Sequence, residues 1–161
     1  MTTIKNKKIL NIVLIFSVLA LSAAYFIQYV MGHKPCNLCL VERIPYFGST
    51  ILISLIFITN KYERISSSII AFLFIAGMIT SFYHFGIEQG FFTESLVCEL
   101  EKIMNNPTAS DLLRDLENKT ISCKEVNFRF FGVSLATLNT VISFILSVIM
   151  IKIVISYEKN R

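Results

Sequence analysis

Two of the four cysteines in this 161-residue chain, Cys36 and Cys39, stand in Cys-x-x-Cys spacing. This spacing is typical of thiol–disulfide chemistry, in which the thiolate is the reacting species. Pro35 prevents the preceding connection from being helical up to Cys36, so we expect a helix to begin at the pair. A helix N-terminus stabilises negative charge, and Cys39 is the better placed of the two cysteines. The pair is therefore predicted to supply an activated thiolate.

Arg43 follows Cys39 by one helical turn, so its permanent charge is expected to stabilise a thiolate there. The alternative for Arg43 is an interfacial side chain that reaches outward to water. The cysteine pair has two alternatives of its own, an inert structural disulfide and a zinc site shared with Cys98 and Cys123. Those two lie 25 positions apart and cannot form a second close pair of ligands, so we expect no metal. Haem attachment is excluded because Leu40 stands where histidine is required.

The elements that must position these residues are apolar helices. Hydrophobic residues make up 54% of the chain, and its mean hydropathy is +0.64, far above that of a soluble protein. We expect a single membrane domain over residues 1–161, an all-α bundle with transmembrane helices over about 9–31, 41–60, 66–85 and 132–152. The apolar run 44–59 alone is short for a crossing. Its extension backwards draws Cys39, Glu42 and Arg43 to the membrane surface.

The first span has one alternative, a cleaved signal peptide, since lysines precede it and small residues lie inside it. Its apolar stretch is longer than the usual signal-peptide core and continues through Tyr25, Phe26 and Ile27. This favours a retained transmembrane helix.

Basic side chains on the short connections predict the orientation of the bundle. Lys and Arg are in excess at the N-terminus, in the 60–64 connection and in the C-terminal tail, whereas the other two connections are together acidic. By the positive-inside rule both termini are cytoplasmic. The four cysteines then fall in two periplasmic loops, a short first loop over about 32–40 and a long second loop over about 86–131. An even number of cysteines on the oxidising side indicates a disulfide framework.

The long loop also contains one predicted helix. Thr108 to Asp111 offers helix-starting chemistry, and Leu112, Leu113 and Leu116 would line one face of a short amphipathic helix lying on the membrane surface. The chain has no glycine-rich nucleotide-binding motif, and we expect no nucleic acid among its partners.

Several short motifs follow one another along the chain in a specific order. They are Pro35–Cys39, Glu42-Arg43, Tyr83–Gly90, the pair Cys98 and Cys123, and Phe130–Leu135. Together, from about residue 10 to residue 150, they resemble the DsbB family of disulfide bond formation proteins. Asn127-Phe128 departs from the Pro-Trp of many members, and the chain has no tryptophan.

The resemblance implies a protein disulfide oxidoreductase of the bacterial inner membrane that keeps the periplasm oxidising. Cys98 would form a mixed disulfide with a reduced periplasmic thioredoxin-fold partner of the DsbA type. Cys123 would then exchange with Cys36, and Cys39 would pass the electrons to a membrane quinone, either ubiquinone or menaquinone.

The resemblance also implies a quinone site in the lipid bilayer beside Cys39. Arg43 would donate hydrogen bonds to a quinone oxygen as it gains charge, and His84 would line the same pocket and donate to the other oxygen. A purely structural histidine is the alternative for His84. Glu42 belongs with this group, paired with a neighbour or with lipid headgroups, and Glu88, one turn after His84, would orient the imidazole.

The position of each cysteine pair agrees with this division of labour. A quinone lives in the bilayer, and only Cys36 and Cys39 adjoin a span. A protein partner is aqueous, and only Cys98 and Cys123 lie in a long loop. The 24 residues between them would allow this loop to bring Cys123 to Cys36 for exchange.

Two other readings remain open. A vitamin K epoxide reductase-like enzyme has its loop cysteines before the Cys-x-x-Cys motif, whereas here they follow it, which favours the DsbB type. A non-enzymatic membrane scaffold stapled by disulfides would have no need of Arg43 close to Cys39. A transporter usually keeps ionisable residues at mid-depth, and the predicted spans have none there.

Overall fold

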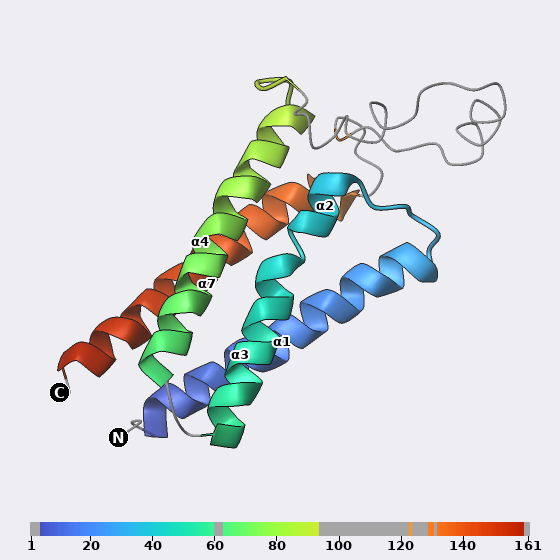
Figure 1. Ribbon diagram of the computed structural model, residues 1–161. Helices are drawn as coiled ribbons and strands as arrows, with labels where there is room; N and C mark the ends of the chain where they lie inside the picture. Colours follow the sequence, from blue (N-terminus) through green and yellow to red (C-terminus); the bar gives the residue numbers. More distant parts are fainter. Residues whose placement is uncertain (1–3, 60–62, 94–122, 124–128, 131, 160–161) are drawn as a thin grey trace, which may run out of the picture.

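The computed structural model describes residues 4–59, 63–93, 123, 129–130 and 132–159. Its helices, in chain order, are α1 (Ile4–Tyr29), α2 (Asn37–Val41), α3 (Ile44–Thr59), α4 (Glu63–Glu88) and α7 (Leu135–Lys159) (Figure 1). Within the described residues four stretches are long and apolar enough to cross a membrane, and α2 and α3 together form the second: Asn6–Tyr29, Asn37–Thr59, Glu63–Glu88 and Leu135–Ser156. The expected all-α fold with four transmembrane helices is confirmed.

The helices run up and down, so each end of the bundle collects particular parts of the chain. The start of α1, the end of α3, the start of α4 and the end of α7 lie at one end (Figure 1). The short helix α2 and the end of α4 lie at the other end. The cysteine pair at the start of α2 therefore lies far from the end of the bundle where α1 begins and α7 finishes.

The second crossing is broken between α2 and α3. Pro45 has no N–H to donate to the carbonyl of Val41, and its ring would clash with that carbonyl in a continuous helix. Helix α2 accordingly ends at Val41, and Glu42 and Arg43 form a turn before α3 begins at Ile44. The break places Glu42 and Arg43 in the turn between the two helices, beside the cysteine pair.

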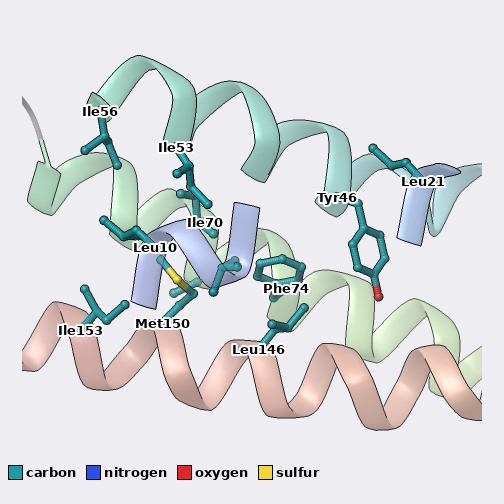
Figure 2. Close-up of a cluster of buried hydrophobic side chains, with 12 residues drawn as sticks. Leu10, Leu21, Tyr46, Ile53, Ile56, Ile70, Phe74, Leu146, Met150 and Ile153 are labelled. Atoms are coloured by element: carbon teal, nitrogen blue, oxygen red, sulfur yellow. The ribbon is translucent and has the colours of Figure 1, made fainter. Parts of the chain in front are cut away.

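One hydrophobic cluster holds the four long helices together. It includes Leu10 of α1, Ile53 of α3, Phe74 of α4 and Met150 of α7, all of them fully buried (Figure 2). Lipid removes the hydrophobic drive between helices, so close packing and polar contacts must hold them together. Gly77 of α4 is such a contact, because a Cβ atom added there would lie 2.8 Å from the Pro45 ring.

Polar side chains also join the helices inside the bundle. The hydroxyls of Ser17 in α1 and Ser49 in α3 lie 3.0 Å apart and are both fully buried.

Many large apolar side chains on the outer faces are exposed, as lipid-facing residues must be, among them Ile12, Leu19, Ile58, Phe72 and Phe144.

A small hairpin precedes the last helix. Strand β1 (Arg129–Phe130) pairs antiparallel with β2 (Val133–Ser134), and Gly132 adopts a positive φ of 83° at the turn. The Ser134 hydroxyl accepts a hydrogen bond from the backbone N–H of Thr137 and so caps α7. This local pairing is why α7 starts at Leu135 and not at 132, the predicted start of the fourth span.

The other helix bounds can be compared with the predicted spans. Helix α3 has the bounds of the apolar run 44–59, and α4 extends past 66–85 at both ends. The amphipathic helix expected after Thr108 lies outside the described residues, as does Cys98.

Candidate redox site

Cys36 and Cys39 form a disulfide at the start of α2, with their Cα atoms 5.1 Å apart. Cys36 is the N-cap residue of this helix, and its Sγ accepts a hydrogen bond of 3.2 Å from the backbone N–H of Cys39. The sequence predicts Cys39 as the better placed of the two cysteines at the helix N-terminus. Because α2 begins at Asn37, the capping sulfur is that of Cys36, and Cys39 is already the third helical residue.

His84 reaches the cysteine pair from α4. Its Nε2 atom lies 3.6 Å from Cys36 Sγ, and its Nδ1 atom lies 2.7 Å from Glu42 Oε1. Only 3% of His84 and 7% of Glu42 is exposed, so this contact is almost completely shielded from solvent. The predicted site residue His84 is thus brought to the cysteines, with its ring held between a sulfur and a carboxylate.

The second oxygen of Glu42 is held by α7. Asn139 donates from Nδ2 to Glu42 Oε2 over 2.8 Å, and the Tyr46 hydroxyl donates to Asn139 Oδ1 over 2.5 Å. Sequence reasoning placed Glu42 with a neighbour or with headgroups and did not single out Asn139 or Tyr46. The sequence did offer one sign of this contact. Asn139 is a polar residue within the apolar segment 132–152, and polar side chains inside a transmembrane helix usually hydrogen-bond to another helix.

Glu88 lies one helical turn beyond His84, as expected, but it is not the group that orients the ring. Its Oε1 atom lies 3.8 Å from His84 Nε2, on the side that faces Cys36, while Glu42 binds Nδ1. The other oxygen of Glu88 is buried and has no hydrogen-bond partner among the described residues. Glu88 therefore offers a carboxylate close to the reactive face of the imidazole.

Arg43 is held against α1. It donates from a guanidinium nitrogen to Gln28 Oε1 over 2.6 Å, and its guanidinium carbon lies 5.0 Å from the centre of the Tyr25 ring, a cation–π contact. The break after α2 places Arg43 in the turn, so it does not continue the helical face of Cys39 as expected from the spacing. Both residues nevertheless line the same cavity.

This cavity has a volume of about 300 Å³ and lies between α1, the cysteine pair and α7. Its accessible wall is mostly apolar, and besides the polar side chains already described it is lined by His33 and Lys34 from the connection after α1. Apolar walls with a small number of convergent polar groups are typical of sites for flat organic ligands. The lining includes Ala20, Ala24, Ile27, Cys36, Cys39, Glu42, Arg43, His84, Leu135, Leu138 and Ile142.

Cys123 lies directly at this site. It is 2% exposed and packs in one buried cluster with Cys36, Leu38 and Ile87. Its backbone lies within hydrogen-bonding reach of the His84 ring. Cys123 is itself disulfide-bonded. A cysteine from the loop between α4 and α7 is thus adjacent to Cys36, the residue with which exchange was predicted.

Comparison with known proteins bears on this arrangement of cysteines. The family model for disulfide bond formation protein DsbB matches residues 6–153. This chain belongs to the DsbB family. An uncharacterized protein of Rickettsia prowazekii is 31% identical over 157 residues, covering 96% of this chain and 91% of the relative.

Several relatives of the chain carry the name disulfide bond formation protein B. The one from Stutzerimonas stutzeri is 30% identical over 124 residues, covering 74% of this chain and 76% of the relative. The one from Haemophilus influenzae strain Rd is 28% identical over 167 residues, covering 97% and 93%. No solved structure matches the chain.

DsbB-family membership and the Cys36–Cys39 disulfide together support a disulfide-forming membrane oxidoreductase. The four apolar helices make it a multi-pass membrane protein.

Proposed function

We propose that this chain reoxidises a periplasmic thioredoxin-fold dithiol of the DsbA type and passes the two electrons to a membrane quinone. The observation that carries the proposal is the position of the Cys36–Cys39 disulfide. It lies between the mostly apolar cavity on one side and Cys123, a loop cysteine, on the other. A redox relay between an aqueous protein and a lipid-soluble acceptor needs such a position.

The aqueous half of the relay uses the loop cysteines. The partner's thiolate attacks Cys98 in a Cys98–Cys123 disulfide, and Cys123 leaves as a thiolate. Cys123 then attacks Cys36 Sγ, a Cys36–Cys123 bond forms, and Cys39 leaves as a thiolate. The packing of Cys123 against Cys36 supports this second exchange, because the attacking sulfur need not travel far.

The membrane half uses the cavity beside Cys39. A bound quinone would accept two electrons and two protons there. The apolar side chains of α1 and α7 would hold its ring, and the Arg43 guanidinium, fixed by Gln28 and Tyr25, would donate to an oxygen that gains charge. Glu42 has both oxygens engaged by His84 and Asn139, so it would act through these neighbours.

The proposal includes an orientation in the bacterial inner membrane, with both termini cytoplasmic and the cysteines periplasmic. The excess of Lys and Arg on the predicted cytoplasmic connections supports it. The start of α1 and the end of α7 share the end of the bundle opposite to α2, as this topology requires.

Quinone reduction by the purified protein in detergent tests the proposal. The electron donor is a reduced periplasmic thioredoxin-fold dithiol, and the absorbances of ubiquinone and menaquinone are followed in parallel. We expect turnover with at least one quinone and its loss in Cys39→Ser, because Cys39 lines the cavity and is the cysteine that the proposed exchange leaves as a thiolate.

Ser68→Ala is the matched control, since the Ser68 hydroxyl is exposed on α4 and bonds only within its own helix. The Ser68→Ala variant should reduce quinone at the wild-type rate. Full turnover in Cys39→Ser, or none with either quinone in a wild-type protein whose disulfides are intact, would contradict the proposal.

A further inference from the structure

We propose that His84 is the acid–base group of Cys36, with Glu42 as its positioning residue. His84 accepts the proton of the Cys36 thiol when the Cys36–Cys39 disulfide re-forms. It returns that proton when Cys36 is expelled from its mixed disulfide with Cys123. The inference rests on the relay described above and assigns to His84 a proton-transfer step at sulfur, which is different from hydrogen bonding to a quinone.

The geometry of the imidazole fits this role. A carboxylate can only accept hydrogen bonds, so Glu42 at 2.7 Å fixes the proton of the neutral ring on Nδ1. The lone pair then lies on Nε2, the atom 3.6 Å from Cys36 Sγ. A sulfur, an imidazole and an orienting carboxylate in sequence is the arrangement of an activated nucleophile.

The carboxylate of Glu42 is held too firmly for an incidental contact. Its oxygens are bound from two different helices, by His84 of α4 and by Asn139 of α7. Tyr46, one turn beyond Glu42 on α3, fixes the Asn139 amide in turn. A buried carboxylate is costly unless it is fully hydrogen-bonded, and this one has a partner on each oxygen.

Glu88 completes the surroundings of the ring. A proton taken up at Nε2 makes His84 a cation, and Glu88 Oε1 at 3.8 Å and Glu42 on Nδ1 both stabilise that charge. The titratable groups that face His84 are thus Glu42 from the turn after α2, Glu88 from α4, and the cysteines. Helix α7 contributes the neutral Asn139. The other titratable groups of the cavity wall are His33 and Lys34 from the connection after α1, Arg43 from the turn after α2 and Tyr46 of α3.

The proton count closes over one cycle. Attack of Cys123 on Cys36 releases Cys39 as a thiolate, so Cys39 needs no base. The partner's second thiolate attacks the partner sulfur of the mixed disulfide, which oxidises the partner and expels Cys98 as a thiolate. Cys98 then attacks Cys123 and expels Cys36 as a thiolate, which takes the proton from the His84 imidazolium. When Cys36 and Cys39 rejoin, two electrons go to the quinone and the Cys36 proton returns to His84. The two protons on the quinol balance those released by the partner's two thiols.

Steady-state quinone reduction as a function of pH tests the inference in the full-length protein. His84→Gln keeps a donor for Glu42 but cannot carry a proton. We expect its kcat to fall roughly 10²-fold near neutral pH with the quinone KM unchanged, as for loss of a general acid–base group. The defect should shrink as pH rises, because hydroxide can deprotonate Cys36 directly. Imidazole added to His84→Ala should restore part of the rate.

A second readout does not depend on quinone turnover. In the chemically reduced protein, alkylation of Cys36 by iodoacetamide is followed by peptide mass spectrometry across the same pH range. The reactive thiolate of Cys36 should appear at higher pH in His84→Gln than in the wild type. Ser68→Ala, which removes an exposed hydroxyl that donates to the carbonyl of Arg64 on the same helix, is the matched control and should leave both profiles unchanged.

The outcomes separate the possible roles. An increased quinone KM with unchanged kcat in His84→Gln would make His84 a quinone contact and overturn the inference. A pH-independent loss of rate with an unchanged alkylation profile would make it structural, and this too overturns the inference. If wild-type protein failed to reduce quinone, the proposed function would fall, whereas the alkylation profile would still decide the relation between His84 and Cys36.

Discussion

At the residue scale the chemistry depends on the hydrogen-bond partners of the polar side chains that line the cavity. Cys36 and His84 contact each other, Glu42 holds His84, and Asn139 holds Glu42. Arg43 belongs to a separate contact with Gln28 and Tyr25 on α1. The site therefore has two polar parts, one at the sulfur of Cys36 and one at the guanidinium of Arg43, where the proposed quinone carbonyl would bind, and they can be tested independently.

Arg43→Ala tests the second part. Removal of a charged donor should raise the quinone KM roughly 10- to 100-fold, which corresponds to the loss of a charge-assisted hydrogen bond of about 1.5–3 kcal/mol. The Cys36–Cys39 disulfide should still form, as measured by thiol titration under denaturing conditions.

Lys152→Ala removes a charge from α7 at the opposite end of the bundle and serves as the control. If the quinone KM of Arg43→Ala were the same as that of wild type, Arg43 would be only an anchor between the turn and α1.

Residue types and spacing singled out the cysteine pair and Arg43, and the family resemblance added His84. They were not enough to find the partners of Glu42, because His84 and Asn139 lie 42 and 97 positions away along the chain. Contacts of that separation depend on how the helices are rotated and stacked. A single sequence shows that α4 and α7 are apolar, but it does not show which of their polar residues face inward at the same depth.

At the element scale the decisive feature is the break between α2 and α3. Apolar length alone predicted the run 44–59, and α3 has those bounds. The run was too short for a crossing, and α2 supplies the missing length on the other side of a two-residue turn. Pro45 was visible in the sequence as an interruption. Its effect on Arg43, which leaves the helical face of Cys39, required the structure.

Pro45 also controls how closely α3 and α4 approach each other. An added Cβ at Gly77 would lie 2.8 Å from the rigid Pro45 ring, whereas at Gly48 it would meet the end of the flexible Leu73 side chain at 2.7 Å. Gly77→Ala should therefore destabilise the protein by about 1–3 kcal/mol, the usual cost of overpacking. Gly48→Ala should cost less, because Leu73 can change rotamer.

Reversible unfolding in mixed detergent micelles, followed by circular dichroism, measures both variants against the wild type. Because Pro45 adjoins the turn that holds Glu42, Gly77→Ala should also lower quinone turnover. Equal stability of the two variants would show that this helix contact does not limit packing.

At the scale of the whole molecule, the four transmembrane crossings determine on which side of the membrane each connection lies. Helices α1 and α7 must start and finish at the same end of an up-and-down bundle, so one orientation in the membrane decides the environment of all four cysteines. Only the periplasmic side is oxidising enough for their disulfides to persist. The charge bias of the connections and the proposed redox chemistry therefore favour the same orientation.

Fusion reporters test this orientation in bacterial cells. Green fluorescent protein joined after Arg161 should fluoresce, and alkaline phosphatase joined after Gly90, just past the end of α4, should be active, since the latter enzyme needs periplasmic disulfides. The controls carry the reporters at the opposite sites: alkaline phosphatase after Arg161 should be inactive, and green fluorescent protein after Gly90 should not fluoresce. Inactive phosphatase after Gly90 would place Cys36 and Cys39 in the reducing cytoplasm, where a relay that exports electrons from a periplasmic dithiol could not operate. Active phosphatase there would place the cysteine pair, the imidazole of His84 and the partner on one side of the membrane, which the relay requires.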